Sequence, residues 1–489
     1  MNYRDEPRPS FTARAGFLSK IGVVSEKAET YDKSARLKRR PFIIPCRTSG
    51  PTISDVALEG RFGILFSRSS PAMLSRANAR PRKMEESWLH TEPAHESPKS
   101  SITSPQHQTS GGKSAGPPLG ENTASAGEAA LARGQVTANG RMGRVSGVRI
   151  AGTGSFVPEN IVTNEDLAAL GCDSEWIVRR TGIRQRRHAA SDEATSDMCY
   201  AASMRCLENA EVAASEVDLV LVATITPDHQ TPSTASQLQG RLGISAPAMD
   251  LGVACSGFTY ALVTAAQFIA AGNAKNVLVV GADLMTRTID PDDKKTYPLF
   301  GDAAGAVLVT PTAVDRGGNA DRADDAPPAE EENAAADGLL SYQLGSEGIC
   351  GEMLCVPAGG SRQSLTPDAY AAGDHYMKMD GRNVFKWAVR VVDESAKDVL
   401  THAGVAPDEL ALLILHQANQ RIIDSAVAGL KVDPAKVFVN LDKYGNTSAA
   451  SIPLALDEAV RGGRVQRDDL ILMSGFGAGL AWGTLLLRW

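Results

Sequence analysis

The chain has 489 residues, enough for two to four domains, and its net charge of −7 gives no support to nucleic acid as a partner. Its seven cysteines are scattered without a Cys-x-x-Cys pair, so neither a disulfide framework nor a metal site is predicted. No run of about 18 apolar residues occurs, so no membrane-spanning helix is expected.

Residues 1–142 differ in composition from the rest of the chain. They hold 21 Lys and Arg against 13 Asp and Glu, or about +8, which leaves about −15 for residues 143–489. Residues 100–140 have almost no large apolar side chains, so the segment is predicted to be disordered. A basic, Ser-rich leader is typical of an organelle transit region. Transit regions contain few acidic residues, but four occur among the first thirty here. Two alternatives therefore stay open: a disordered extension without a targeting function, or a start codon placed too far upstream.

From residue 143 onward, short β-rich runs alternate with helical patterns. The predicted strands lie at 148–154, 218–226, 248–253, 276–281 and 306–310. The predicted helices lie at 164–170, 195–210, 233–242 and 257–271. This alternation predicts a doubly wound, layered α/β fold. Residues 315–337 are rich in Gly, Asp, Pro and Glu without an apolar period, which predicts a disordered insertion between halves at 143–314 and 338–489.

The second half repeats the plan of the first. A strand at 410–416 corresponds to 219–226, a strand at 437–441 followed by a turn corresponds to 249–254, and 469–473 corresponds to 276–280. The pattern predicts two duplicated α/β halves related by a pseudo-two-fold axis, with helices and sheets in the order α-β-α-β-α. Residues at equivalent strand ends should then converge, where open α/β sheets bind ligands.

Cys255 follows an apolar strand and directly precedes a helical pattern that begins at Ser256-Gly257. A cysteine at a helix N-terminus is expected to have a lowered thiol pKa, which favours the nucleophilic thiolate. Taken alone, Cys255 fits a small buried residue of the core better than a nucleophile.

His416 ends the strand equivalent to 219–226, and Asn446 lies on the elbow equivalent to that of Cys255. Their side chains are neutral hydrogen-bond donors suited to a negatively charged oxygen formed from a thioester carbonyl. Singly, His416 is consistent with a core histidine and Asn446 with a turn residue. Their joint occurrence with Cys255 on corresponding elements favours a catalytic set.

Residues 144–489 resemble β-ketoacyl-[acyl-carrier-protein] synthase III, the condensing enzyme that initiates type II fatty-acid synthesis and belongs to the thiolase superfamily. The motifs that carry the resemblance are Trp-Ile-Val-Arg-Arg-Thr-Gly-Ile at 176–183, Val-Ala-Cys-Ser-Gly-Phe at 253–258, Phe-Gly-Asp-Ala-Ala-Gly at 300–305, Gly-Arg-Asn-Val-Phe-Lys at 381–386, His-Gln-Ala-Asn-Gln-Arg-Ile at 416–422, Gly-Asn-Thr-Ser-Ala-Ala-Ser at 445–451 and Gly-Phe-Gly-Ala-Gly-Leu-Ala-Trp-Gly at 475–483. The resemblance implies a thiolase-like fold and a homodimer.

The resemblance also implies roles for individual residues. The catalytic set would be Cys255, His416 and Asn446, with the backbone N–H groups of Cys255 and Ala478 as the oxyanion hole. Residues implied to hold coenzyme A and its pantetheine arm are Trp176, Arg180, Thr181, Lys294, Gly381, Phe385 and Asn419. Residues implied to contact the acyl carrier protein are Gln417, Ala418, Asn419, Gln420, Arg421 and Lys386. A further basic pair of the family is replaced here by Ala428 and Gly429, with Lys431 nearby.

The resemblance therefore implies an acyltransferase that condenses acetyl-coenzyme A with malonyl-carrier protein, without a metal or redox cofactor. The alternatives are a polyketide-type condensing enzyme of the same fold and a non-catalytic subunit that binds acyl carriers. A bacterial-type synthase behind a long leader suggests a plastid, apicoplast-like, with a mitochondrion or the cytoplasm as alternatives.

Overall fold

The structure, a computed structural model, describes residues 140–312 and 337–489. The predicted leader at 1–142, except its last three residues, lies outside the described residues, as does the predicted insertion at 315–337 except its last residue. The proposed disorder of both segments, and the organelle address, stay predictions. Among the helices of the described ranges, none is long and apolar enough to cross a membrane.

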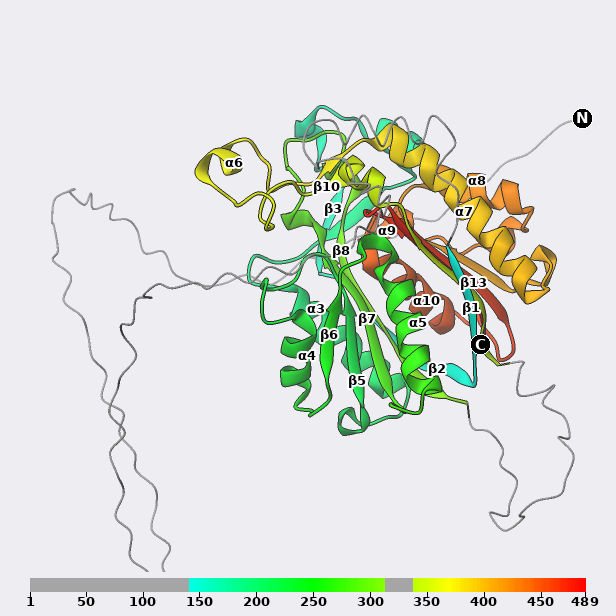
Figure 1. Ribbon diagram of the computed structural model, residues 1–489. Helices are drawn as coiled ribbons and strands as arrows, with labels where there is room; N and C mark the ends of the chain where they lie inside the picture. Colours follow the sequence, from blue (N-terminus) through cyan, green and yellow to red (C-terminus); the bar gives the residue numbers. More distant parts are fainter. Residues whose placement is uncertain (1–139, 313–336) are drawn as a thin grey trace, which may run out of the picture. The chain divides into compact units, whose positions relative to one another are not determined.

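Two five-stranded sheets form the centre of the molecule (Figure 1). The first has the order β2-β8-β7-β5-β6, in which β2, β8 and β7 are antiparallel neighbours and β7, β5 and β6 are parallel. Its strands are β2 (Val148–Phe156), β5 (Leu219–Ala223), β6 (Ala248–Leu251), β7 (Val277–Leu284) and β8 (Asp302–Pro311). The second has the order β1-β9-β14-β13-β12, and only its last pair is parallel. Its strands are β1 (Arg141–Ser146), β9 (Gly338–Ser346), β12 (Leu412–Leu415), β13 (Leu470–Gly477) and β14 (Ala481–Arg488).

The two sheets share one connection plan, as the predicted duplication requires. The antiparallel run β2-β8-β7 corresponds to β9-β14-β13, and β5 corresponds to β12. The prediction of a strand at 437–441 as the counterpart of β6 is wrong. Only a single parallel bridge, from Leu413 to Val437, forms there. The side chain of Gln417 donates to the Phe438 carbonyl and accepts from the Asn440 N–H, so it takes the place of a neighbouring strand.

Helices complete five layers in the predicted order. Helices α3 (Thr195–Asn209) and α4 (Thr234–Leu242) cover the outer face of the first sheet, and α7 (Gly381–Ala403) and α8 (Gln420–Leu430) cover the second-sheet side. Helices α5 (Gly257–Ala270) and α10 (Ser451–Arg461) pack between the sheets, so apolar residues such as Phe258 and Leu456 are fully buried. The shorter helices are α2 (Ser174–Thr181), α6 (Pro367–Ala371) and α9 (Leu441–Tyr444), and short strand pairs join β3 (Asn160–Thr163) to β4 (Gln185–His188) and β10 (Leu354–Cys355) to β11 (Lys378–Met379).

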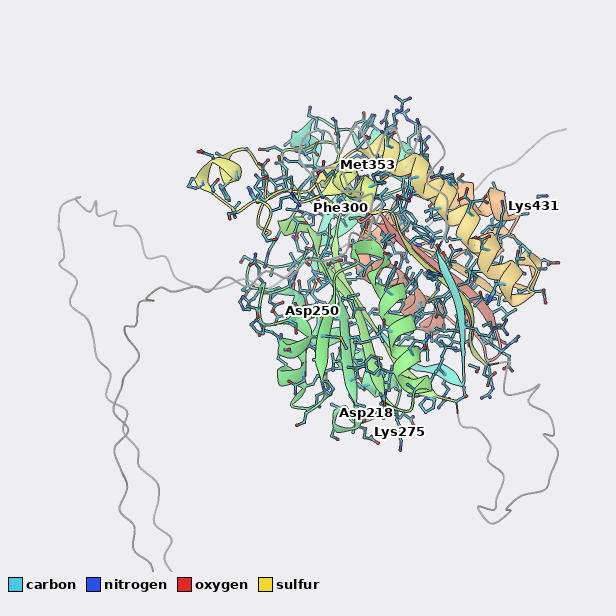
Figure 2. The ribbon with its side chains drawn as sticks, viewed as in Figure 1. Asp218, Asp250, Lys275, Phe300, Met353 and Lys431 are labelled. Atoms are coloured by element: carbon cyan, nitrogen blue, oxygen red, sulfur yellow. The ribbon has the colours of Figure 1, made fainter. Side chains whose placement is uncertain are left out.

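The parallel strands give the first sheet a functional direction. β5 and β7 begin beside Asp218 and Lys275, where the Asp218 carboxylate accepts the Lys275 N–H at 2.7 Å. Figure 2 shows these two residues at the bottom of the view and Phe300 in its upper half. The carboxyl ends of the parallel strands therefore point toward the Phe300 region, where ligands are expected.

Two further expectations need correction. The predicted boundary at residue 143 falls within β1, a strand that the sequence pattern does not predict and that pairs with β9 in the second sheet. The predicted helix at 164–170 is limited to one short turn at Ala168–Leu170. There, Asn164 donates its side-chain amide to the Ile183 carbonyl, and Asp166 accepts the Thr163 N–H, so local side-chain bonds replace helical ones.

Because β1 covers the edge of β9 and buries Val145, we expect it to mark where the folded unit starts. A chain beginning at Gly140 should melt within about 1 °C of the full-length protein. A chain beginning at Val148 should melt roughly 5 °C lower, since one buried Val contributes about 1.5–3 kcal/mol and each kcal/mol shifts Tm by about 2–4 °C. Calorimetry of the three chains checks this. Equal melting of the two shortened chains would contradict it.

Candidate active site

Two turns with the same backbone geometry build the site. Ala254–Ser256 precedes α5, and Ser448–Ala450 precedes α10. Each begins with a residue of positive φ, 46° at Ala254 and 50° at Ser448. This match aligns Cys255 with Ala449 and Asn446 with Gly252. The predicted elbows are thus equivalent, but Asn446 precedes its turn whereas Cys255 lies within its own.

Each turn packs against a strand of the opposite half, the Cys255 turn against β13 and the Ser448 turn against β7. The approach leaves no room for side chains on the strands. A Cβ at Gly477 would lie 2.9 Å from the Cys255 Cβ, and a Cβ at Gly281 would overlap the Ala449 carbonyl oxygen. Residues from both halves are thereby brought to one point.

The predicted catalytic residues line a single cavity of about 110 Å³. Apolar side chains form most of the remaining wall, and the backbone of Gly477 and Ala478 passes beside Cys255. The apolar lining residues are Ile225, Leu299, Phe300, Leu354, Met377, Met379, Val384, Phe385, Ala418, Ile422 and Phe476. The structure therefore brings Cys255, His416, Asn446 and Ala478 together, while their chemical roles stay predictions.

Cys255 is only 8% exposed, and its Sγ lies 3.4 Å from the Ser448 Oγ. Burial raises the pKa of the Cys255 thiol from 9.0 to about 12, an effect that the Ser448 hydrogen bond offsets in part. A rise of this size corresponds to about 4 kcal/mol, whereas a helix N-terminus contributes about 0.3–2 kcal/mol. The expected lowering of the thiol pKa is therefore corrected: burial outweighs the helix, and the resting group is a thiol.

His416 is positioned by a hydrogen bond at its Nδ1 and is a neutral donor. Its Nδ1 lies 2.7 Å from the Ser451 Oγ, and burial lowers the pKa of the imidazole to about 3. The Ser451 oxygen also accepts the Gln417 N–H at 3.4 Å, so we assign the serine proton to His416 Nδ1. In this tautomer Nε2 carries the hydrogen.

Asn446 is oriented by its own turn. Its Oδ1 accepts the Ser448 N–H at 2.9 Å, which leaves the Nδ2 hydrogens as the free donors. Its backbone N–H donates to the Leu299 carbonyl and its carbonyl accepts the Gly301 N–H. Beneath this pairing, the fully buried Arg186 donates to the Pro298 carbonyl at 2.7 Å and so fixes the segment that carries Leu299.

The residues predicted to hold the nucleotide of coenzyme A gather around α2. Trp176 is half-buried, and the exposed Arg180 places its guanidinium 5.0 Å from the centre of the indole ring. Lys294 is exposed and lies beside Gly171, shortly before α2 begins. Thr181 is corrected: it is buried, and its hydroxyl donates to the Ile177 carbonyl and accepts the Ile183 N–H, so it closes the helix instead of facing a ligand.

Gly381, Phe385 and Asn419, predicted to face the pantetheine arm, all line the cavity. Asn419 also joins two elements, because its amide donates to the Arg180 carbonyl at 3.1 Å while its oxygen caps α8 by accepting the Arg421 N–H. Asn419 therefore connects the residues predicted to face the pantetheine arm with those predicted to hold the nucleotide of coenzyme A.

The predicted carrier-protein segment divides into buried and exposed residues. Gln417 is corrected, because it is 1% exposed and bonded to the backbone of Leu415 and Asn440. Ala418 lines the cavity, and Gln420 is half-buried and bonded to Asp424. Arg421 and Lys386 are exposed, and Arg421 lies over the Phe385 ring at 5.2 Å. These two cations remain the candidates for docking an acidic carrier.

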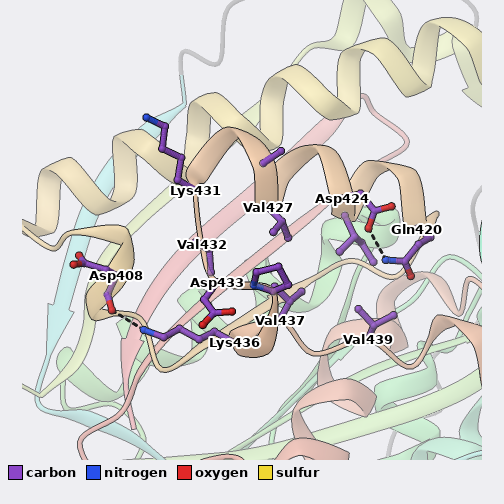
Figure 3. Close-up of a pocket in the computed structure, with 13 residues that line it drawn as sticks. Asp408, Gln420, Asp424, Val427, Lys431, Val432, Asp433, Lys436, Val437 and Val439 are labelled. Carbon is purple, nitrogen blue, oxygen red and sulfur yellow. Dashed lines mark hydrogen bonds between the residues drawn. The ribbon is translucent and has the colours of Figure 1, made fainter.

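A groove of about 790 Å³ lies on the same side of the molecule, between α8 and residues 432–439 (Figure 3). Its lining mixes acidic and basic side chains around an apolar floor of valines and Ile423. The charged ones are Asp408, Asp424, Asp433, Lys431 and Lys436. The mixture gives no net positive field, and the predicted catalytic residues lie elsewhere.

Several residues at the site were not foreseen. Ser448 and Ser451 lie within a motif that the sequence singles out, but the turn geometry that aligns Ser448 with Ala254 is needed to assign them. Asp283 lies near the end of β7, two residues after the predicted strand at 276–281, and nothing in its spacing distinguishes it from a surface residue. In the two described ranges, no group of three His, Cys, Asp or Glu side chains is placed to hold a metal ion.

The neutral state of His416 has a measurable consequence. In the unfolded chain the His416 imidazole binds a proton below about pH 6.5, whereas in the folded chain it stays neutral down to about pH 3. The unfolded state therefore binds more protons between these values, and the free energy of unfolding should fall as the pH drops through this window. His416→Asn should make the profile flatter between pH 6.5 and 5, as followed by urea unfolding. An unchanged slope would show that the imidazole titrates normally in the folded protein.

Comparison with known proteins supports one family. Residues 249–322 match the family model of 3-oxoacyl-[acyl-carrier-protein] synthase III, and residues 400–489 match the model of its C-terminal part. The chain is 68% identical over 348 residues to the β-ketoacyl-[acyl-carrier-protein] synthase III of Rhodopirellula baltica, covering 71% of this chain and 100% of that protein. It is 45% identical over 344 residues to the synthase of Desulfitobacterium hafniense, covering 70% and 98%. The crystal structure of the Aquifex aeolicus synthase superposes with a TM-score of 0.60 at 42% identity, covering 70% and 100%. The chain therefore belongs to the β-ketoacyl-[acyl-carrier-protein] synthase III family.

Proposed function

We propose that this chain condenses acetyl-coenzyme A with malonyl-[acyl-carrier protein], giving acetoacetyl-[acyl-carrier protein], carbon dioxide and coenzyme A. The observation that carries the proposal is the convergence of Cys255, His416 and Asn446 from two halves on one cavity, in a chain of this family. The reaction is an acyl transfer followed by a decarboxylating condensation, and it initiates type II fatty-acid synthesis.

In the first step, the Cys255 sulfur attacks the thioester carbonyl of acetyl-coenzyme A, and coenzyme A leaves. The N–H groups of Cys255 and Ala478 are proposed to stabilise the carbonyl oxygen during the attack. The cavity of about 110 Å³ equals the share of liquid volume of roughly four water molecules, which suits a short acyl group.

In the second step, malonyl-carrier protein loses carbon dioxide beside the acyl-enzyme. The negative charge then develops on its thioester oxygen, toward which the Nε2–H of His416 and the Nδ2–H of Asn446 are proposed to donate. The resulting carbon nucleophile attacks the acetyl carbonyl and releases Cys255. Neither step as proposed uses a metal or a redox cofactor.

The first test concerns the nucleophile. Intact-mass spectrometry after incubation with acetyl-coenzyme A should show one acetyl adduct per wild-type chain and none in Cys255→Ser, because a serine hydroxyl is a much weaker nucleophile without a strong base. Cys350→Ser, at another buried cysteine, serves as the control and should keep the adduct. An adduct that persists in Cys255→Ser would refute the assignment.

The second test separates the donors from the nucleophile. His416→Ala and Asn446→Ala should still accept acetyl but lose malonyl decarboxylation by roughly 10² or more, the usual cost of one oxyanion donor. The double variant should be little worse than the more damaged single one, since both donors act on one oxygen. Acetyl uptake and release of labelled carbon dioxide are measured in each variant. Loss of acetyl uptake in His416→Ala would instead make histidine the base for the thiol.

We also propose a homodimer. The strand β6 is an edge of the first sheet, and the large apolar side chain of Met249 on it is 39% exposed. A second copy that pairs along β6 would cover both the strand edge and Met249. Light scattering should give the mass of two chains for the wild type, and Met249→Pro should shift it toward one. The control residue is Met204, an exposed methionine on α3. Because a proline would disrupt the helix, the control substitution is Met204→Lys, which should leave the measured mass unchanged.

A further inference from the structure

Arg186 is a fully buried cation on β4. Its side chain is 0% exposed, and it takes part in none of the ion pairs formed by the residues that the structure describes. Burial lowers the pKa of its guanidinium to about 10, so the group is still charged at neutral pH. A buried charge without a counter-ion opposes folding, whereas an apolar side chain of similar volume does not. Stability alone therefore does not explain the presence of Arg186.

Backbone and amide oxygens take the place of a counter-ion. Nη2 of Arg186 donates to the Asn164 Oδ1 at 2.8 Å and to the Pro298 carbonyl at 2.7 Å, while Nη1 donates to the Val162 carbonyl at 3.2 Å. Asn164 presents its oxygen because its own amide nitrogen donates to the Ile183 carbonyl. A guanidinium holds its donors in one rigid plane, so these acceptors fix its position. Arg186 thereby joins the β3–β4 pair to the segment that contains Pro298.

The segment joined in this way forms part of the cavity wall. Leu299 and Phe300 line the cavity, and the Leu299 carbonyl accepts the Asn446 N–H at 2.8 Å. The Asn446 carbonyl accepts the Gly301 N–H at 3.0 Å, which gives a parallel bridge between Phe300 and Asn446. Asn446 is therefore placed by backbone bonds to residues 299 and 301, which directly follow the residue that Arg186 holds.

The backbone of β4 contacts both of these segments. A Cβ at Gly301 would lie 3.1 Å from the Arg186 Cβ, and a Cβ at Gly445 would lie 3.4 Å from it. The Arg184 N–H also donates to the Asp442 carbonyl in α9 at 3.0 Å. Residues 298–301 and 442–446 therefore share one support. The guanidinium of Arg186 is the part of this support that a substitution can remove without altering the backbone bonds.

We propose that Arg186 is a positioning residue for malonyl decarboxylation: it fixes residues 298–301, and through their backbone bonds it holds the Asn446 amide toward the thioester oxygen. The inference rests on the proposed function of Asn446. Arg186 is not among the described residues that line the cavity, so it acts through Asn446 and not on the substrate. Because a 1 Å misplacement of a reacting group can lose about 10² in rate, we expect a loss of roughly tenfold when the guanidinium is removed and the backbone pairing stays.

The proposal predicts a selective defect in Arg186→Gln. Acetyl uptake depends on Cys255, which lies on the other turn, so its rate should change less than about threefold. Malonyl decarboxylation should lose roughly tenfold in kcat, while KM for malonyl-carrier protein changes less than about twofold. If Arg186 only stabilised the fold, the substitution would lower the melting temperature and reduce both activities by the same factor.

A double-mutant cycle with Asn446→Ala tests the coupling directly. If Arg186 acts through the Asn446 amide, Arg186→Gln should slow decarboxylation roughly tenfold when Asn446 is present and less than about twofold in Asn446→Ala. Release of labelled carbon dioxide from malonyl-carrier protein gives each rate. Equal factors in the two backgrounds would show that Arg186 acts independently of Asn446 and would overturn the proposal.

Arg187→Gln is the matched control. Arg187 is the next residue of β4, and its Nη1 donates to the Pro158 carbonyl at 3.0 Å instead of to residues 298–301. Because successive side chains of a strand point to opposite faces, the same substitution here should leave decarboxylation within about twofold of the wild type. An equal loss in Arg187→Gln would assign the defect to a weakened β3–β4 pair and contradict the proposal.

Arg186→Lys decides the question if Arg186→Gln does not fold. The ammonium group keeps the charge but lacks the planar fork that reaches Asn164, Val162 and Pro298 together, so a selective loss of roughly threefold is expected. Decarboxylation equal to that of the wild type in Arg186→Lys would overturn the proposal. A wild-type chain that neither takes up acetyl nor releases carbon dioxide would refute the proposed function and this inference with it, whereas normal wild-type turnover with equal factors in the cycle would refute only the inference about Arg186.

Discussion

The site depends on the close contact between each half's turn and one strand of the other half, β13 or β7. Gly477 on β13 lies against Cys255, and Gly281 on β7 lies against Ala449, with no space for a side chain at either position. Neither half alone holds the nucleophile and both donors. The cavity is therefore a property of the assembled pair of sheets, and residues that secure the interface act on the chemistry without touching a substrate.

The same contact buries the reacting groups, and burial decides their charge. It raises the pKa of the Cys255 thiol to about 12 and lowers that of the His416 imidazole to about 3. Both effects favour the neutral pair over a thiolate with an imidazolium. A neutral imidazole that donates through Nε2 suits a developing oxyanion.

The sequence predicts elements whose hydrogen bonds follow the regular backbone pattern. The helix expected at 195–210 is observed as α3, Thr195–Asn209, and the strand expected at 276–281 is observed as β7. It fails at 164–170 and 437–441, where Asn164 and Gln417 bond the backbone with their side chains. It does not predict β1, since a pairing with β9 across the chain leaves no local signal. The catalytic trio follows from motif and duplication, whereas burial, and with it the thiol pKa, depends on the assembled structure.

The two duplicated turns have the same backbone geometry but carry different side chains. The three aligned pairs are Gly252 with Asn446, Ala254 with Ser448, and Cys255 with Ala449. In each pair one half carries a functional side chain and the other a small residue that leaves space for it. Ala449 in place of a second cysteine presents only its N–H to Asp283, while Ala254 leaves the cavity side of the first turn open. Two functional side chains at both members of a pair would compete for one small cavity, so the asymmetry follows from the symmetry of the backbone.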